Sequence, residues 1–209
     1  MIFTSTGITD NEPIPERFAM GIYDEDDHAV FGPNQNPGFA WEDLPGGTGS
    51  LVIVCHDPDV PDSGEKVNVE GETVPADADR ITYHHWLLVD IDPDMDDIPV
   101  AEFSNGVTEG GKDGPEGPMG TRQGINDYTN WFEGDPDMEG TYFGYDGPFP
   151  PWNDEIVHHY HFTCYALDVE EAPISGEFTG DELLEAIEGH ILDQASITGL
   201  YKLNPDVDY

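Results

Sequence analysis

The chain has 209 residues, and its 45 Asp and Glu residues against 6 Lys and Arg residues give a formal net charge of −39 at pH 7. This charge excludes binding to nucleic acid or to an anionic membrane surface, because there is no basic patch to replace phosphate counterions. Aromatic residues make up 11% of the chain, and several apolar runs interrupt the acidic sequence, which argues against disorder and for a packed domain.

The acidic residues are spread along the chain and are not collected in one tail. We interpret them as an acidic surface adapted to a halophilic cytoplasm, because at molar salt the Debye length is only about 3 Å and carboxylates no longer repel each other over distance. Residues 1–5 lack the basic and apolar segments of a signal peptide, and no apolar run approaches the roughly 20 residues of a membrane-spanning helix. We therefore expect a cytoplasmic protein without membrane insertion.

Short apolar segments separated by Gly, Pro and Asp clusters predict one mainly β domain over residues 1–209, an antiparallel β-sandwich with Greek-key connections. The first strong segment, residues 51–55, is continuously apolar and suits a central strand. Residues 57–61 follow it as a bend after the strand, because Asp-Pro favours turns. The acidic residues 62–80 are expected to form an excursion on the surface.

A second strand is predicted over residues 83–91, where the side chains alternate with a period of two. One face would carry Tyr83, His85, Leu87, Val89 and Ile91. The other face would carry His84, Trp86, Leu88 and Asp90.

Residues 104–124 contain seven glycines and two prolines and predict a loop that wraps closely over a pocket. The proline-rich segment 147–151 precedes a third strand at 158–166. There, His158, Tyr160, Phe162, Cys164 and Ala166 would share one face, and His159, His161, Thr163 and Tyr165 the other.

A C-terminal helix is predicted to begin at a capping box, in which the Thr179 hydroxyl and the Glu182 carboxylate satisfy the first amide donors. The apolar residues that follow repeat at helical spacing and would form one buried stripe: Leu183, Leu184, Ile187, Ile191, Leu192 and Ala195.

The two cysteines, Cys55 and Cys164, lie inside apolar strands. Buried free thiols behave as small hydrophobic groups, and disulfides are rare in the cytosol, so we expect neither a disulfide nor a catalytic cysteine.

Fragments from about residue 36 to residue 201 resemble, in order and at compatible spacing, the phosphatidylethanolamine-binding protein family, which includes the Raf kinase inhibitor proteins and their bacterial and archaeal relatives. They are residues 36–41, 57–61, 83–86, 126–128, 147–151, 158–162, 165–168 and 198–201. The resemblance implies a β-sandwich with a small pocket at the strand tips. The ligand-binding residues that it implies are Asp57, Asp59, Tyr83, His85, Gly147, Pro148, Pro150, Pro151, His158 and Tyr160.

Within this set, Asp59 is also expected to fix the loop as a hydrogen-bond acceptor. His84, which is not in the set, is expected to be structural. His159 stands where the family usually has Arg, which removes a cation capable of bidentate pairing. Imidazole and phenol groups donate hydrogen bonds, so the pocket suits a phosphate or phosphorylated headgroup.

The expected function is therefore non-enzymatic binding of a small anionic ligand, without a cofactor or a metal, with a regulatory role toward a kinase or protease as a further implication of the resemblance. The sequence leaves open whether a protein partner binds at the pocket rim and whether the chain forms an oligomer. The alternative is a metal-dependent enzyme that uses the Asp and His residues of the pocket. A nucleophilic hydrolase is disfavoured because the chain has no G-x-S-x-G motif.

The salt adaptation yields a direct prediction. When the protein is moved from molar salt to dilute buffer, the fold is expected to loosen, because unscreened carboxylates then repel each other. Circular dichroism across a salt series measures this change, and full native ellipticity in dilute buffer would contradict it.

Overall fold

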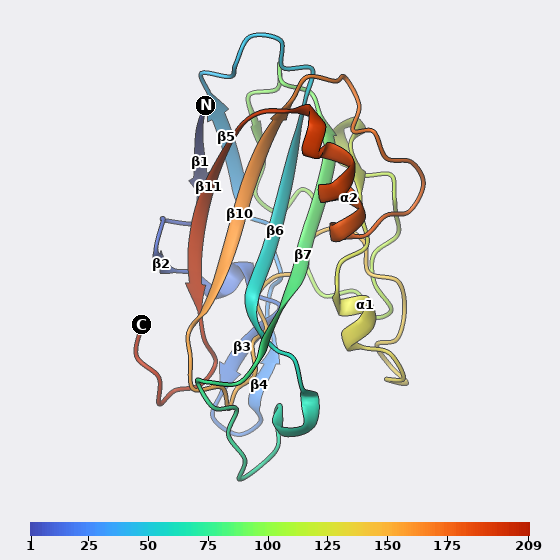
Figure 1. Cartoon of the computed structure of the whole chain (residues 1–209). Coiled ribbons are helices and arrows are strands. Elements are labelled where there is room, and N and C mark those ends of the chain that lie inside the picture. Colours follow the sequence, from blue (N-terminus) through green and yellow to red (C-terminus); the bar gives the residue numbers. More distant parts are fainter.

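The computed structural model describes all of residues 1–209, and its largest element is a six-stranded sheet (Figure 1). The strand order is β2-β11-β10-β6-β7-β9, and all neighbours are antiparallel except the parallel pair β11 and β2. The bounds are β2 Glu12–Pro13, β6 Ser50–Pro61, β7 Arg80–Ile91, β9 Arg122–Gln123, β10 His158–Leu167 and β11 Ile191–Tyr201. The connection from β7 to β10 crosses to the other side of β6. Strand β10 therefore pairs with β6, although the two strands are not consecutive in the chain.

A second sheet of three strands, in the order β1-β5-β8, packs against one face of the first. Its bounds are β1 Ile2–Thr6, β5 Gly38–Glu42 and β8 Asp97–Ile98, and a separate hairpin consists of β3 Gly21–Asp24 and β4 His28–Phe31. The larger hydrophobic core lies between the two sheets, where Phe39 of β5 contacts Trp86 of β7 and Phe162 of β10. The predicted antiparallel β-sandwich is confirmed.

Helical segments are short. The two α-helices are α1, Tyr128–Trp131, and α2, Gly180–Ile187, and the 3-10 turns are η1 Glu16–Phe18, η2 Gly64–Lys66, η3 Pro118–Gly120 and η4 Glu188–His190. Helix α2 covers the other face of the large sheet, where Leu183 and Ile187 pack on Val52, Val54 and Leu87. None of the helices is both long enough and apolar enough to span a membrane.

The predicted C-terminal helix is correct at its start and wrong at its end. The capping box is present: Glu182 accepts a hydrogen bond from the Thr179 amide at 2.9 Å. The helix ends at Ile187, however, and Ile191, Leu192 and Ala195 belong to strand β11. Backbone pairing with β10 along this segment replaces the helical bonds, and Leu192 is 42% exposed instead of buried.

Irregular pairing between β6 and β7 also corrects the predicted faces of residues 83–91. Cys55 pairs with Trp86 and His56 pairs with His84, so His85 is an extra residue in a β-bulge. As a result His85 and Trp86 both point to the sandwich side, whereas Leu87 and Val89 face α2. A further irregularity returns Ile91 to the sandwich core.

The other strand predictions are largely confirmed. The two predicted faces of residues 158–166 are correct, with Tyr160, Phe162 and Cys164 in the core. Strand β6 does not end in a bend after Cys55, because pairing with β7 continues, with a bulge after Asp57, as far as Pro61. Cys55 and Cys164 are buried free thiols.

The close contact between α2 and β7 yields a prediction about Gly180. A Cβ atom at this position would lie 2.3 Å from the ring of His84, so Gly180→Ala is expected to lower the free energy of unfolding by about 1–3 kcal/mol. Urea denaturation measures the change. Gly189→Ala is the matched control, since no atom lies within 4 Å of a Cβ there, and its effect should stay within about 0.5 kcal/mol. Equal effects of the two substitutions would contradict the packing argument.

Candidate functional site

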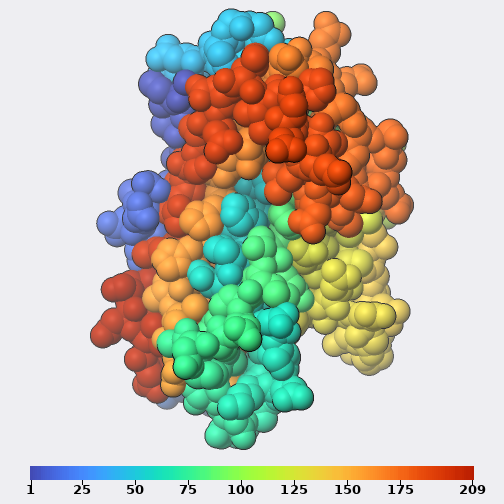
Figure 2. Space-filling view, in the orientation of Figure 1, coloured from blue at the N-terminus to red at the C-terminus, as the bar shows by residue number.

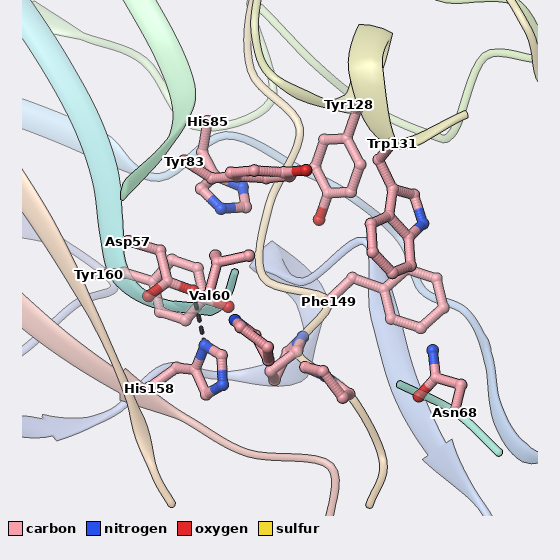
Figure 3. Close-up of a pocket in the computed structure, with 13 residues that line it drawn as sticks. Asp57, Val60, Asn68, Tyr83, His85, Tyr128, Trp131, Phe149, His158 and Tyr160 are labelled. Atoms are coloured by element: carbon pink, nitrogen blue, oxygen red, sulfur yellow. Dashed lines mark hydrogen bonds and ion pairs between the residues drawn. The ribbon is translucent and has the colours of Figure 1, made fainter. Parts of the chain in front are cut away.

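A buried ion pair between Asp57 and His158 lies at the base of a small cavity (Figure 3). Asp57 lies near the end of β6 and His158 at the start of the neighbouring strand β10, so the two side chains meet at one end of the sheet. His158 Nδ1 is 2.7 Å from Asp57 Oδ2. Asp57 Oδ1 accepts the Asp59 amide at 2.8 Å, which holds the carboxylate in place.

The second ring nitrogen of His158 is also occupied by a carboxylate. Nε2 is 3.2 Å from Asp154 Oδ2, and Asp154 in turn forms an ion pair with Arg80. Carboxylate oxygens only accept hydrogen bonds, so His158 donates from both nitrogens and is an imidazolium. The four groups alternate in charge from Asp57 to Arg80, and their formal charges cancel.

The electrostatics of this chain of charges agree with its geometry. Burial opposes protonation of His158, but the charges and hydrogen bonds of Asp57 and Asp154 outweigh it and raise the pKa of His158 to about 9. Burial by itself would raise the pKa of Asp57, yet the charge of His158 and its hydrogen bond bring that pKa below its usual value. The network therefore stays ionised at neutral pH.

His85 presents a free ring nitrogen to the same cavity. Its Nδ1 lies 3.0 Å from the carbonyl oxygen of Asp146, so Nδ1 carries the proton and donates it. Burial lowers the pKa of His85, which keeps the ring neutral. Nε2 is then an unprotonated acceptor, and it is buried without any hydrogen-bond partner.

A phenol and several rigid side chains complete the cavity. Tyr160 packs edge-on against His85 with ring centroids 5.1 Å apart, and burial followed by the charge of Asp57 raises the pKa of its hydroxyl well above the usual value. The cavity has a volume of about 30 Å³, enough for one or two water-sized groups. Its remaining lining residues are Val60, Pro61, Asn68, Tyr83, Tyr128, Trp131, Phe149, Pro150 and Pro151.

Most of the residues that the sequence pointed to meet at this cavity. Asp57, Tyr83, His85, Pro150, Pro151, His158 and Tyr160 all line it. Asp59, Gly147 and Pro148 do not.

Each of these three residues has a structural contact instead. Asp59 Oδ2 accepts hydrogen bonds from both the amide and the ring of His159, near the start of β10. Gly147 lies so close to Phe18 that a Cβ atom would be 2.0 Å from the Phe18 carbonyl oxygen. The Pro148 carbonyl accepts the amides of residues 20 and 21.

Sequence reasoning did not assign Tyr128, Trp131, Phe149 or Asn68 to the site. Phe149 and Tyr128 lay within matched fragments, and Trp131 follows Tyr128 by three residues on α1, so helical spacing would have placed both on one face. Helix α1 is held beside β7 because Asp127 accepts the His84 amide at 2.6 Å. Asn68 comes from the 62–80 excursion, which no local pattern could direct toward the cavity.

The loop that carries His85's acceptor is fixed by a buried ion pair. Asp146 is fully buried and contacts Lys112 at 2.6 Å, Asn34 at 2.7 Å and Asn126 at 2.9 Å. Lys112 comes from the glycine-rich loop 104–124. That loop therefore supports the cavity from behind and supplies none of its lining residues.

The ionised state of His158 predicts a dependence of stability on pH. Its folded pKa of about 9 lies above the ordinary value of 6.5, so its contribution is complete below pH 6.5 and is lost as pH rises through 9. The free energy of unfolding should fall by about 3 kcal/mol over this range. Urea denaturation at each pH measures it, and His158→Gln should lack the fall while His190→Gln keeps it.

A second measurement does not depend on a variant. Nitrogen NMR of the native protein should show both ring nitrogens of His158 protonated at neutral pH. A neutral His158 ring, or an unchanged pH profile in the glutamine variant, would contradict the assignment.

Comparison with known proteins agrees with the fold and the matched fragments. The family model described as phosphatidylethanolamine-binding protein matches residues 4–202. A UPF0098 protein of Methanothermobacter thermautotrophicus is 32% identical over 171 residues, covering 82% of this chain and 85% of the relative. The UPF0098 protein YbhB of Escherichia coli is 28% identical over 201 residues, covering 96% and 99%.

Solved structures show the same architecture. The crystal structure of E. coli YbcL, described as a member of the mammalian PEBP family, superposes with a TM-score of 0.66 at 24% identity and covers 96% of each chain. The PEBP homologue CT736 of Chlamydia trachomatis gives a TM-score of 0.62 at 25% identity, with coverage of 96% and 95%. This chain belongs to the phosphatidylethanolamine-binding protein family.

Proposed function

We propose that this protein binds a small ligand through a singly protonated oxyanion, such as the monoanion of a phosphate ester. The observation that supports this proposal is the unpartnered, buried Nε2 of His85 at the cavity. A buried polar atom without a partner costs free energy, and a ligand that supplies a hydrogen-bond donor removes that cost.

The hydrogen-bonding groups of the cavity set what the ligand must offer. His158 has both nitrogens engaged by Asp57 and Asp154, so it is not a free donor, in contrast to the expectation from sequence. Tyr160 offers a neutral hydroxyl, which lies beside the Asp57 carboxylate and would turn from it to the ligand, and His85 offers an acceptor. A complementary ligand end therefore accepts one hydrogen bond and donates another.

Asp57 decides between the ionisation states of an oxyanion. A dianion would bring two negative charges close to the Asp57 carboxylate and would have no proton for His85 Nε2. A monoanion with one O–H group donates to Nε2 and keeps an ionised oxygen for the Tyr160 hydroxyl, and hydrogen bonds that involve an ionised group are the stronger ones. The singly protonated form thus fits the cavity better.

The shape of the cavity agrees with a ligand that enters by its polar end. The volume of about 30 Å³ admits only a few atoms beside His85 and Tyr160. Rigid side chains at Pro150, Pro151 and Phe149 enclose this space, and Trp131 is 41% exposed at its mouth. The rest of the ligand would lie against these apolar groups.

Two other functions have less support from the site geometry. A regulatory contact with a kinase or protease stays a prediction from family resemblance, and at His159, where the family usually has Arg, the side chain is paired with Asp59. The metal-dependent enzyme also stays a prediction. No three His, Cys, Asp or Glu side chains are grouped so as to hold a metal ion, and the cavity proposal requires none.

Isothermal titration calorimetry with methyl phosphate tests the proposal. Binding should tighten by about twentyfold from pH 7.5 to pH 5.5, because the second pKa of a phosphate ester lies near 6 and the monoanion is the form that binds. Heats in buffers of different ionisation enthalpy should show proton uptake at the higher pH. Absence of binding at both pH values would refute the proposal.

Methyl sulfate and two variants sharpen this experiment. Methyl sulfate is a similar monoanion without a proton, so it should bind much more weakly at pH 5.5; equal affinity would place the proton on His85 instead. Tyr160→Phe should weaken methyl phosphate binding about tenfold through the lost hydrogen bond. Tyr165→Phe, on the same strand but facing away from the sandwich core, is the control and should change nothing.

A further inference from the structure

Three histidines form a row across three adjacent strands on the face of the large sheet that points away from the cavity. His84 of β7 pairs with His56 of β6, and His56 pairs with His161 of β10. His159 lies two residues before His161 on the same face of β10, with ring centroids 6.5 Å apart. The cavity proposal uses none of these four side chains.

We call His84, His56 and His161 the histidine row. The part of the row formed by His56 and His161 is open to solvent. Figure 2 shows that α2 covers only part of this face and leaves β10, β6 and β7 uncovered beside it. His56 and His161 are both half-buried, whereas His84 is buried under the start of α2, next to Gly180. An ion in solution can therefore reach His56 and His161.

Both His56 and His161 have ring nitrogens that form no hydrogen bond with the protein. The His56 ring forms no hydrogen bond with the protein, and neither of its ring nitrogens is shut off from solvent. His161 uses Nδ1 in a 2.9 Å contact with Thr198 Oγ1, which orients the ring and leaves Nε2 free. The ring centroids of His56 and His161 are 5.1 Å apart, compared with 6.3 Å between His56 and His84.

The geometry points to a binding site for a divalent transition-metal ion between His56 and His161. Imidazole nitrogens suit Zn²⁺, Ni²⁺ and Cu²⁺, whereas Mg²⁺ and Ca²⁺ prefer oxygen ligands. The four histidines do not converge as a group of three or more around one point, so two protein ligands hold the ion and water fills its other positions. The net charge of −39 raises the concentration of cations near the surface.

This site joins two strands of the sheet. His56 and His161 lie on directly paired positions of β6 and β10. Their neighbours in sequence, Asp57 after His56 and Tyr160 before His161, point to the opposite face and line the cavity. An ion held by both rings would bind the folded sheet and not the unfolded chain. It would therefore stabilise the protein by mass action.

Titration calorimetry with ZnCl₂ on protein stripped with EDTA tests the site, at about pH 7.5 and in about 1 M KCl so that surface carboxylates are screened. We expect one ion per chain. His161→Gln and His56→Gln should each weaken binding at least about tenfold, the loss seen even when an outer partner of a metal ligand is removed. His190→Gln, an exposed histidine paired with Asp168, is the matched control and should bind as the native protein does.

A second measurement keeps the test valid if a variant fails to fold. Substoichiometric Cu²⁺ added to the native protein should broaden the ring proton signals of His56 and His161 first, and leave those of His28 and His190 unchanged. Uniform broadening of all histidines, earlier broadening of His28 or His190, or unaltered Zn²⁺ binding in both glutamine variants would overturn the site.

Discussion

The interaction on which the candidate site depends is the imidazolium of His158 held between two carboxylates. Asp57, near the end of β6, and Asp154, in the loop before β10, each contact one ring nitrogen of His158, and Arg80 pairs with Asp154. An isolated buried charge would be costly, but alternating charges in hydrogen-bonding contact can be kept in a protein interior, and in this network Arg80 Nε is left without a partner. The network links β6, β7 and β10 at one end of the sheet, and it leaves the ligand-facing chemistry to His85 and Tyr160.

A single extra residue in β7 decides which histidine ring faces the cavity. The bulge at His85 turns its ring to the sandwich side, while His84 stays on the opposite face under α2. The same sheet thus carries two different histidine environments. On the sandwich side the rings are enclosed and engaged by carboxylates or carbonyls; on the outer face His56 and His161 keep free nitrogens near solvent.

Local sequence patterns predicted three of the four long strands (β6, β7 and β10), the faces of β10 and the start of α2 correctly, because each depends on near neighbours. They were wrong where distant backbone pairing outweighs a local pattern. Ile191, Leu192 and Ala195 repeat at helical spacing, yet pairing with β10 makes them a strand. The two-residue period of residues 83–91 gave no sign of the bulge, so His85 was wrongly grouped on one face with Leu87 and Val89, although its predicted position at the cavity was correct.

The sequence by itself determined the family, the β class and seven of the residues that line the cavity, since these follow from period-two strands and from motifs that resemble those of the family. Only the tertiary structure decided how those residues are used. The Asp146 carbonyl decides which ring nitrogen of His85 carries the proton. The positive charge of His158 depends on Asp154, a residue outside every matched motif. Protonation and pairing are set by partners far apart in the chain, and composition or spacing does not encode those distances.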